Sequence, residues 1–115
     1  MDRSNNQNYE RMNFTSALVV EGLRSYYDPL IQTGKSIPMP EKDIVFGLKS
    51  GLEKDVKTLR LEGSPQSMEY HLESYELSGV SVDQLYEIDI AVKEELIKIL
   101  DNGGLDRFTE FLGID

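Results

Sequence analysis

The segment from Ser81 to Ile99 limits the fold more than any other part of the chain. Ser81 and Gln84 have the spacing of a capping box, in which each side chain bonds the other residue's backbone N–H at a helix start. Apolar residues then recur at intervals of three and four: Leu85, Ile88, Val92, Leu96 and Ile99. This spacing places them on one face of a long helix. We therefore expect a helix that buries this face against antiparallel neighbours.

A first helix is predicted from about Tyr9 onward. Its apolar residues follow the same spacing: Met12, Val19, Leu23, Tyr26 and Leu30. Asp28-Pro29 interrupts the pattern, so we expect a kink or a restart there. Gly34 is the expected end of this helix.

Two further helices are predicted before Ser81. The second helix begins at Pro40 and ends at Gly63, and its buried face is expected to hold Ile44, Leu48, Leu52, Val56 and Leu59. The third helix begins at Ser64-Pro65 and ends at Gly79. Its inner face is expected to hold Met68, Leu72 and Tyr75.

The chain after Ile99 predicts a break and one more short helix. Asn102-Gly103-Gly104 ends the long helix. Four apolar residues follow at helical spacing and can close the core: Leu105, Phe108, Phe111 and Leu112. No stretch alternates long enough to predict a strand. The expected fold is all-α, a compact bundle of four main helices plus a short C-terminal helix. We expect residues 1–8 to be a disordered polar tail and residues 9–115 to be a single helical domain.

Composition and charge limit the function. The chain has no cysteine, its N-terminus is polar and no run is apolar enough to span a membrane, so we expect a small cytoplasmic protein without a membrane partner. The net charge of −9 is unevenly divided: residues 1–60 hold eight acids and nine bases, whereas residues 61–115 hold thirteen acids and three bases. The second part therefore carries −10 and the first +1. Such a surface favours basic partners.

The stretch GVSVDQLYEI, which begins at Gly79, resembles the turn and early recognition helix of helix-turn-helix regulators, including the tetracycline-repressor-like group. The resemblance covers about a dozen residues and implies a helix-turn-helix-like corner around residue 79. However, the second helix of this corner would carry Asp83, Glu87 and Asp89 before its first lysine, and carboxylates repel DNA phosphates. We therefore expect no nucleic-acid partner. DNA binding stays an alternative through the basic residues of the second helix: Lys49, Lys54, Lys57 and Arg60.

No catalytic or ligand-binding pattern is complete. Gly34-Lys35-Ser36 matches the end of a phosphate-binding loop, but the position where that loop needs its first glycine is Pro29. His71, the only histidine, leaves a histidine phosphotransfer domain as a second alternative. The residue three before it is Met68, so the Glu-x-x-His pattern of a carboxylate-bridged metal site is absent. We expect no enzymatic activity, no cofactor and no metal.

The acidic second half offers a candidate surface. Carboxylates recur along the third helix and the start of the fourth without basic neighbours at helical spacing, and aromatic and aliphatic residues lie beside them. Such a face is more commonly a solvated surface that only keeps a protein soluble, and this interpretation stays open. As the functional interpretation, we expect a non-enzymatic protein of inhibitor, immunity or regulatory-adaptor type that docks a basic protein partner on this acidic helical face. The residues expected to bind the partner are Glu69, Tyr70, Glu73, Glu76, Asp83, Tyr86, Glu87 and Ile90. Ile90 and Ile97 lie off the main apolar face, so a wider core and a homodimer contact are further alternatives for these residues.

Overall fold

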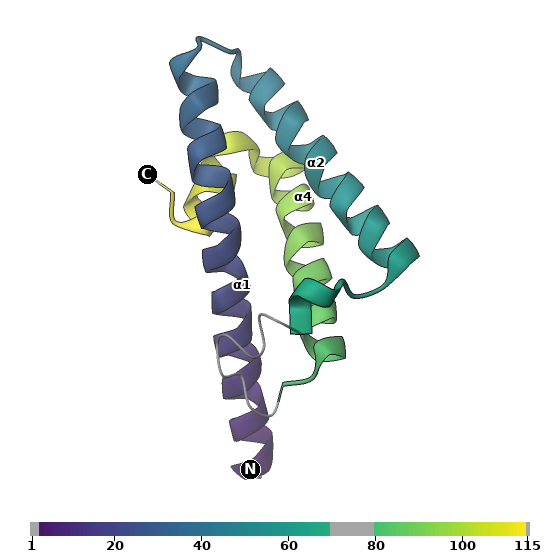
Figure 1. The fold of residues 1–115 in the computed structure, drawn as a ribbon. Coiled ribbons are helices and arrows are strands. Elements are labelled where there is room, and N and C mark those ends of the chain that lie inside the picture. Colours follow the sequence, from purple (N-terminus) through teal and green to yellow (C-terminus); the bar gives the residue numbers. More distant parts are fainter. Residues whose placement is uncertain (1–2, 70–79, 115) are drawn as a thin grey trace.

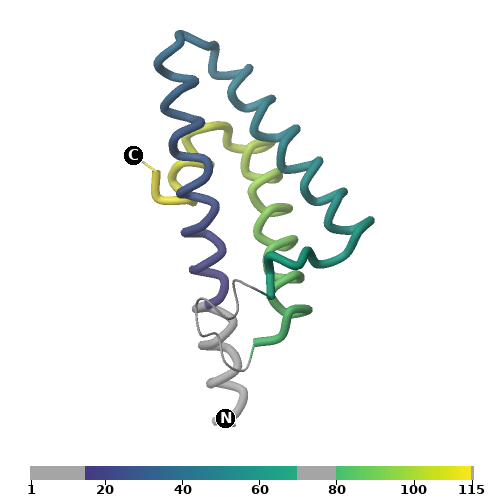
Figure 2. Tube along the Cα trace, viewed as in Figure 1, coloured from purple at the N-terminus to yellow at the C-terminus, as the bar shows by residue number. Residues whose placement is uncertain are grey.

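The computed structural model describes residues 3–69 and 80–114, and their side chains from residue 15 onward. Within these ranges every regular element is a helix: α1 (Arg3–Ser36), α2 (Glu41–Glu62), a helical turn at residues 66–69, and α4 (Val82–Leu112). The predicted all-α bundle is thus confirmed. Helices α1 and α2 diverge from their connection, and α4 lies between them and packs against both (Figures 1 and 2).

Helix α1 is longer than predicted and continues through Pro29. It begins at Arg3, inside the expected tail, and runs through Pro29 to Ser36. Pro29 is tolerated because it and Ser25 are exposed, so the Ser25 carbonyl that loses its helical partner faces water. The prediction that Gly34 ends the helix is wrong. Gly34 is buried, and a Cβ atom there would lie 3.2 Å from two side-chain carbons of Ile44, so the glycine lets α2 approach closely.

The apolar face of α1 differs from the expected one. Tyr26 and Leu30 are exposed, whereas Tyr27 and Ile31, one residue further along, are buried. The ring of Tyr27 packs edge-to-face on Phe108 with 5.6 Å between the ring centroids. Burial, and secondarily the nearby Asp55 carboxylate, raises the pKa of Tyr27 above its usual value. The C-terminal part of α4 therefore sets which face of α1 is buried, and that choice was not visible in the spacing alone.

Helix α2 follows its prediction closely. All five expected residues are buried: Ile44, Leu48, Leu52, Val56 and Leu59. The helix ends at Gly63, whose φ of 81° is in the range that favours glycine. Met68, in the next helical turn, is buried as predicted. Leu72, Tyr75 and the corner around Gly79 lie outside the described residues.

Helix α4 begins with the predicted capping box. The Ser81 backbone N–H donates to Gln84 Oε1 at 2.8 Å, and the Gln84 N–H donates to Ser81 Oγ at 3.1 Å. The predicted break near Asn102-Gly103-Gly104 is a kink at Gly104, where φ is 69° and ψ is −159°. The kink turns the last residues back toward α1 (Figure 1). Leu105, Phe108 and Leu112 then join Tyr27, Ile31 and Leu96 in the larger of two core clusters.

The second core cluster is smaller and lies around the start of α4. It consists of Val56, Leu59, Met68, Leu85 and Ile90, with Val19, Val82, Tyr86 and Ile97 packed against it. This cluster joins α2, the helical turn at 66–69 and α4. It therefore positions the start of α4, which carries Asp83 and Glu87.

Candidate functional site

The predicted partner-binding residues fall into three groups: exposed residues, residues outside the described ranges, and residues with contacts inside the protein. Glu69, Asp83 and Glu87 are exposed, as a docking surface requires. Tyr70, Glu73 and Glu76 lie outside the described residues, as does His71. Tyr86 and Ile90 are described but are not free surface anchors.

Tyr86 and Ile90 have structural contacts. The Tyr86 side chain is half-buried, and its hydroxyl donates a hydrogen bond of 2.6 Å to the carbonyl oxygen of Leu59 on α2. Ile90 is only 5% exposed and belongs to the second core cluster. Both residues lie where α2 covers the flank of α4, which widens the buried face beyond the stripe expected from the sequence. The residues left for a partner are therefore the carboxylates.

Four carboxylates of α4 form a row that the sequence had shown only in part. Asp83, Glu87, Glu94 and Asp101 are separated by four, seven and seven residues, so they lie along one side of the helix. Two of them meet bases of α2. Asp101 Oδ1 lies 2.6 Å from Lys49 Nζ, and Glu94 pairs with Arg60. These contacts raise the pKa of the Lys49 ammonium and of the Arg60 guanidinium, in both cases chiefly through the hydrogen bond to the carboxylate.

The carboxylates at the start of this row lie within ion-pair distance of no described base, although the charge of Glu87 contributes to the raised pKa of Arg60. Asp83 and Glu87 form no ion pair with another described residue, and neither does Glu69. Bases of α2 pair directly with the C-terminal half of the row, so the carboxylates without a direct ion pair are those where α4 begins. We call Glu69, Asp83 and Glu87 the acidic surface.

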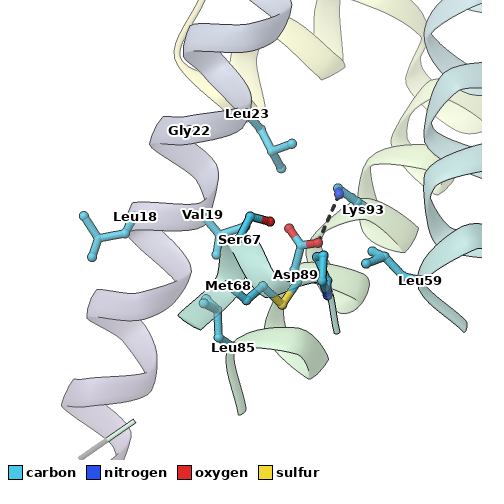
Figure 3. Close-up of a pocket in the computed structure, with 11 residues that line it drawn as sticks. Leu18, Val19, Gly22, Leu23, Leu59, Ser67, Met68, Leu85, Asp89 and Lys93 are labelled. Carbon is cyan, nitrogen blue, oxygen red and sulfur yellow. Dashed lines mark hydrogen bonds and ion pairs between the residues drawn. The ribbon is translucent and has the colours of Figure 1, made fainter. Parts of the chain in front are cut away.

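A pocket of about 380 Å³ lies between α1, residues 65–68 and α4 (Figure 3). Its walls are mostly apolar: Leu18, Val19, Leu23, Leu59, Met68 and Leu85. Asp89 and Lys93 supply a polar wall, on a different side of α4 from Asp83 and Glu87. The pocket lies in the size range of small-ligand and anchor-residue sites.

The polar wall of the pocket holds one carboxylate and one ammonium, those of Asp89 and Lys93. Lys93 Nζ lies 3.0 Å from Asp89 Oδ2 and 3.9 Å from Asp55 Oδ2 (the Asp89 contact is the dashed line of Figure 3). The side chains of Lys93 and Asp89 are only 13% and 16% exposed, so water screens this pair weakly. Of the two carboxylates near Lys93, only Asp89 lines the pocket, because Asp55 lies outside its lining on α2. The wall suits an apolar group that ends in a group able to hydrogen-bond to Asp89.

Gly22 leaves one side of the pocket open. It lines the pocket within α1, and a Cβ atom at this position would meet nothing within 4 Å. The sequence did not predict the pocket, because it is the space left where α1, residues 65–68 and α4 pack incompletely. A glycine inside an apolar helix face was the one available sign.

The structure also bears on the patterns that the sequence left incomplete. Gly34, Lys35 and Ser36 belong to the last turn of α1 and so form no loop. Of the four basic residues considered for DNA binding, Lys49 and Arg60 are paired with α4 carboxylates. Among the described residues, no group of three or more histidine, cysteine, aspartate or glutamate side chains is arranged to hold a metal ion. No described helix is long and apolar enough to cross a membrane.

Comparison of the chain with models of known protein families, with curated proteins and with solved structures found no match.

Proposed function

We propose that the protein is a non-enzymatic binding protein that docks a basic protein partner on its acidic surface. The observation that carries the proposal is the separation of charge along α4. Bases of α2 pair with Glu94 and Asp101, whereas Asp83 and Glu87 have no ion pair with another described residue. Unmatched carboxylates on an exposed helix repel one another slightly, and a basic partner would remove that repulsion while its approach is accelerated.

The pocket supports the same kind of partner. Binding energy at protein interfaces is concentrated in a few side chains that enter well-packed pockets. The apolar walls of this pocket, together with the Asp89 carboxylate in its polar wall, fit the aliphatic stem and charged end of a lysine or arginine. We propose that the pocket takes such an anchor from the partner.

The first experiment tests the acidic surface by charge reversal. The variant E69K/D83K/E87K changes three exposed carboxylates and moves the net charge from −9 to −3. The control E95K/D106K/E110K makes the same change at three other exposed carboxylates of α4. Wild type and both variants are immobilised and exposed to lysate of the host, and captured proteins are quantified. We expect one or more basic proteins captured by wild type and the control but lost with the first variant. Equal capture by all three proteins would contradict the proposal.

The second experiment fills the pocket without damaging the fold. Gly22→Leu places a side chain in open space and replaces a glycine inside a helix, so it should not destabilise the protein. Gly51→Leu is the matched control, because a Cβ atom at Gly51 in α2 also meets nothing within 4 Å and Gly51 does not line the pocket. We expect Gly22→Leu to weaken binding of the captured partner at least about tenfold and Gly51→Leu to leave it unchanged. Unchanged affinity with Gly22→Leu would remove the pocket from the proposal and leave the acidic surface standing.

A further inference from the structure

The exposed face of α1 carries an apolar stripe whose one ring contact among the described residues is internal to the helix, the edge-to-face packing of Tyr26 on Tyr27 with 5.0 Å between the ring centroids. Tyr26, Leu30 and Ile37 are 64%, 50% and 56% exposed. They are separated by four and seven residues, so they lie within roughly 40° of one another around the helix. Ile37 keeps the helical register although α1 ends at Ser36, because its N–H donates to the carbonyl oxygen of Thr33 at 3.2 Å.

This spacing is that of a helix–helix seam. Apolar residues at alternating intervals of four and three, with Val19 and Leu23 preceding Tyr26 and Leu30, are typical of two helices that pack side by side. Val19 and Leu23, at the start of this pattern, pack against the protein's own core. From Tyr26 onward the core takes Tyr27 and Ile31 instead, and the seam continues on the surface.

The stripe is also free of charge. The charged residues of this part of α1 are Glu21, Arg24, Asp28 and Lys35. At 100° per residue, each lies about 120° or more around the helix from Leu30. A basic partner would find no carboxylate here. A second copy of this chain, with its net charge of −9, can approach closely only where neither copy presents acids, and this face meets that condition.

We infer that the Tyr26–Leu30–Ile37 stripe is a self-association face, occupied by the same stripe of a second copy. A two-fold pairing of this kind buries identical patches on both copies. Three side chains of this exposure offer on the order of 350 Å² per copy, about 700 Å² in all, which is below the ~1,200 Å² of a standard stable interface. The dimer is therefore weak and forms at micromolar to millimolar concentration. The two α4 residues that the sequence offered for a homodimer contact do not form this face, since Ile90 is buried and Ile97 packs on both core clusters.

Sedimentation velocity over a concentration series, from about 10 µM to about 1 mM, tests this inference. The variant Leu30→Glu places a carboxylate in the stripe. Its matched control, Leu61→Glu, makes the same change at a 77% exposed leucine of α2. Circular dichroism checks that both variants keep the wild-type helical content. We expect the sedimentation coefficient to rise with concentration for wild type and Leu61→Glu, and the dissociation constant of Leu30→Glu to be at least about tenfold higher.

Two results would overturn the inference. One is a wild-type protein that stays monomeric at the highest concentration, in which case the stripe has another occupant or none. The other is association of Leu30→Glu equal to that of wild type, which would place the dimer contact elsewhere. Neither result bears on the acidic surface, because Leu30 and Leu61 are outside it.

Discussion

Replacing Gly104 with alanine should lower the stability of the protein, because the backbone conformation at this residue is one that almost only glycine adopts. Its φ of 69° with ψ of −159° lies in a region that costs other residues about 1–3 kcal/mol. The chain cannot relieve that strain by straightening α4 without cost. Leu105, Phe108 and Leu112 would then leave the larger core cluster, in which Phe108 is completely buried. We therefore expect Gly104→Ala to lose at least about 1 kcal/mol of unfolding free energy.

The same substitution at Gly51 should have the opposite effect. Gly51 lies inside α2, and a Cβ atom there meets nothing within 4 Å. Alanine in a helix interior is favoured over glycine by about 1 kcal/mol. For a chain of 115 residues, an unfolding entropy of about 2.1 cal/mol/K per residue gives roughly 0.24 kcal/mol/K. The Tm should thus fall by about 4–12 °C for Gly104→Ala and rise by about 4 °C for Gly51→Ala.

Thermal unfolding followed by far-UV circular dichroism measures both shifts, and urea unfolding gives the corresponding free energies. The two variants differ from wild type by the same added methyl group, so composition and hydrophobicity do not explain a difference between them. If Gly104→Ala were as stable as wild type, or if both variants moved the Tm in the same direction, the kink at Gly104 and the packing that depends on it would be wrong.

Three further predictions concern single contacts. Ser81→Ala removes one half of the capping box and should cost about 1 kcal/mol in urea unfolding, whereas Ser50→Ala, at an exposed position inside α2, should not destabilise. Tyr86→Phe removes the hydrogen bond to the Leu59 carbonyl and should cost about 1 kcal/mol; no loss would show that this contact is not formed in solution. The raised pKa of Tyr27 means that the fold holds its hydroxyl neutral, so the stability tied to it is complete below pH about 10 and falls as the pH rises above that value. Wild type should therefore lose more stability than Tyr27→Phe between pH 9 and 11, by up to about 1.4 kcal/mol per pH unit, and parallel pH profiles would contradict this.

The parts of the fold that were predictable from the sequence depend on local signals. Ser81 and Gln84 defined the start of α4, Gly63 the end of α2, and the spacing from Ile44 to Leu59 its buried face. These features involve residues within one or two helical turns. Their physical causes, capping hydrogen bonds and one-sided burial, act without reference to the rest of the chain.

The features that were not predictable depend on contacts between distant segments. Which face of α1 is buried depends on Phe108, more than seventy residues further along the chain. Glycine is common at helix ends, but Gly34 lies inside α1, where it allows close contact with Ile44. The pairing of Glu94 with Arg60 and of Asp101 with Lys49 joins α4 to α2, and neither pair was predicted from the sequence. The spacing of apolar or charged residues along one helix does not show which other helix packs against its side.

The salt dependence of partner affinity tests the acidic surface most directly. The dissociation constant of the captured partner would be measured from about 50 mM to about 500 mM NaCl, for wild type and for E69K/D83K/E87K. We expect the wild-type constant to rise at least about tenfold over this range, and that of the variant to start higher and change much less. A wild-type constant that is insensitive to salt and equal to that of the variant would contradict the proposal that Glu69, Asp83 and Glu87 bind a basic partner.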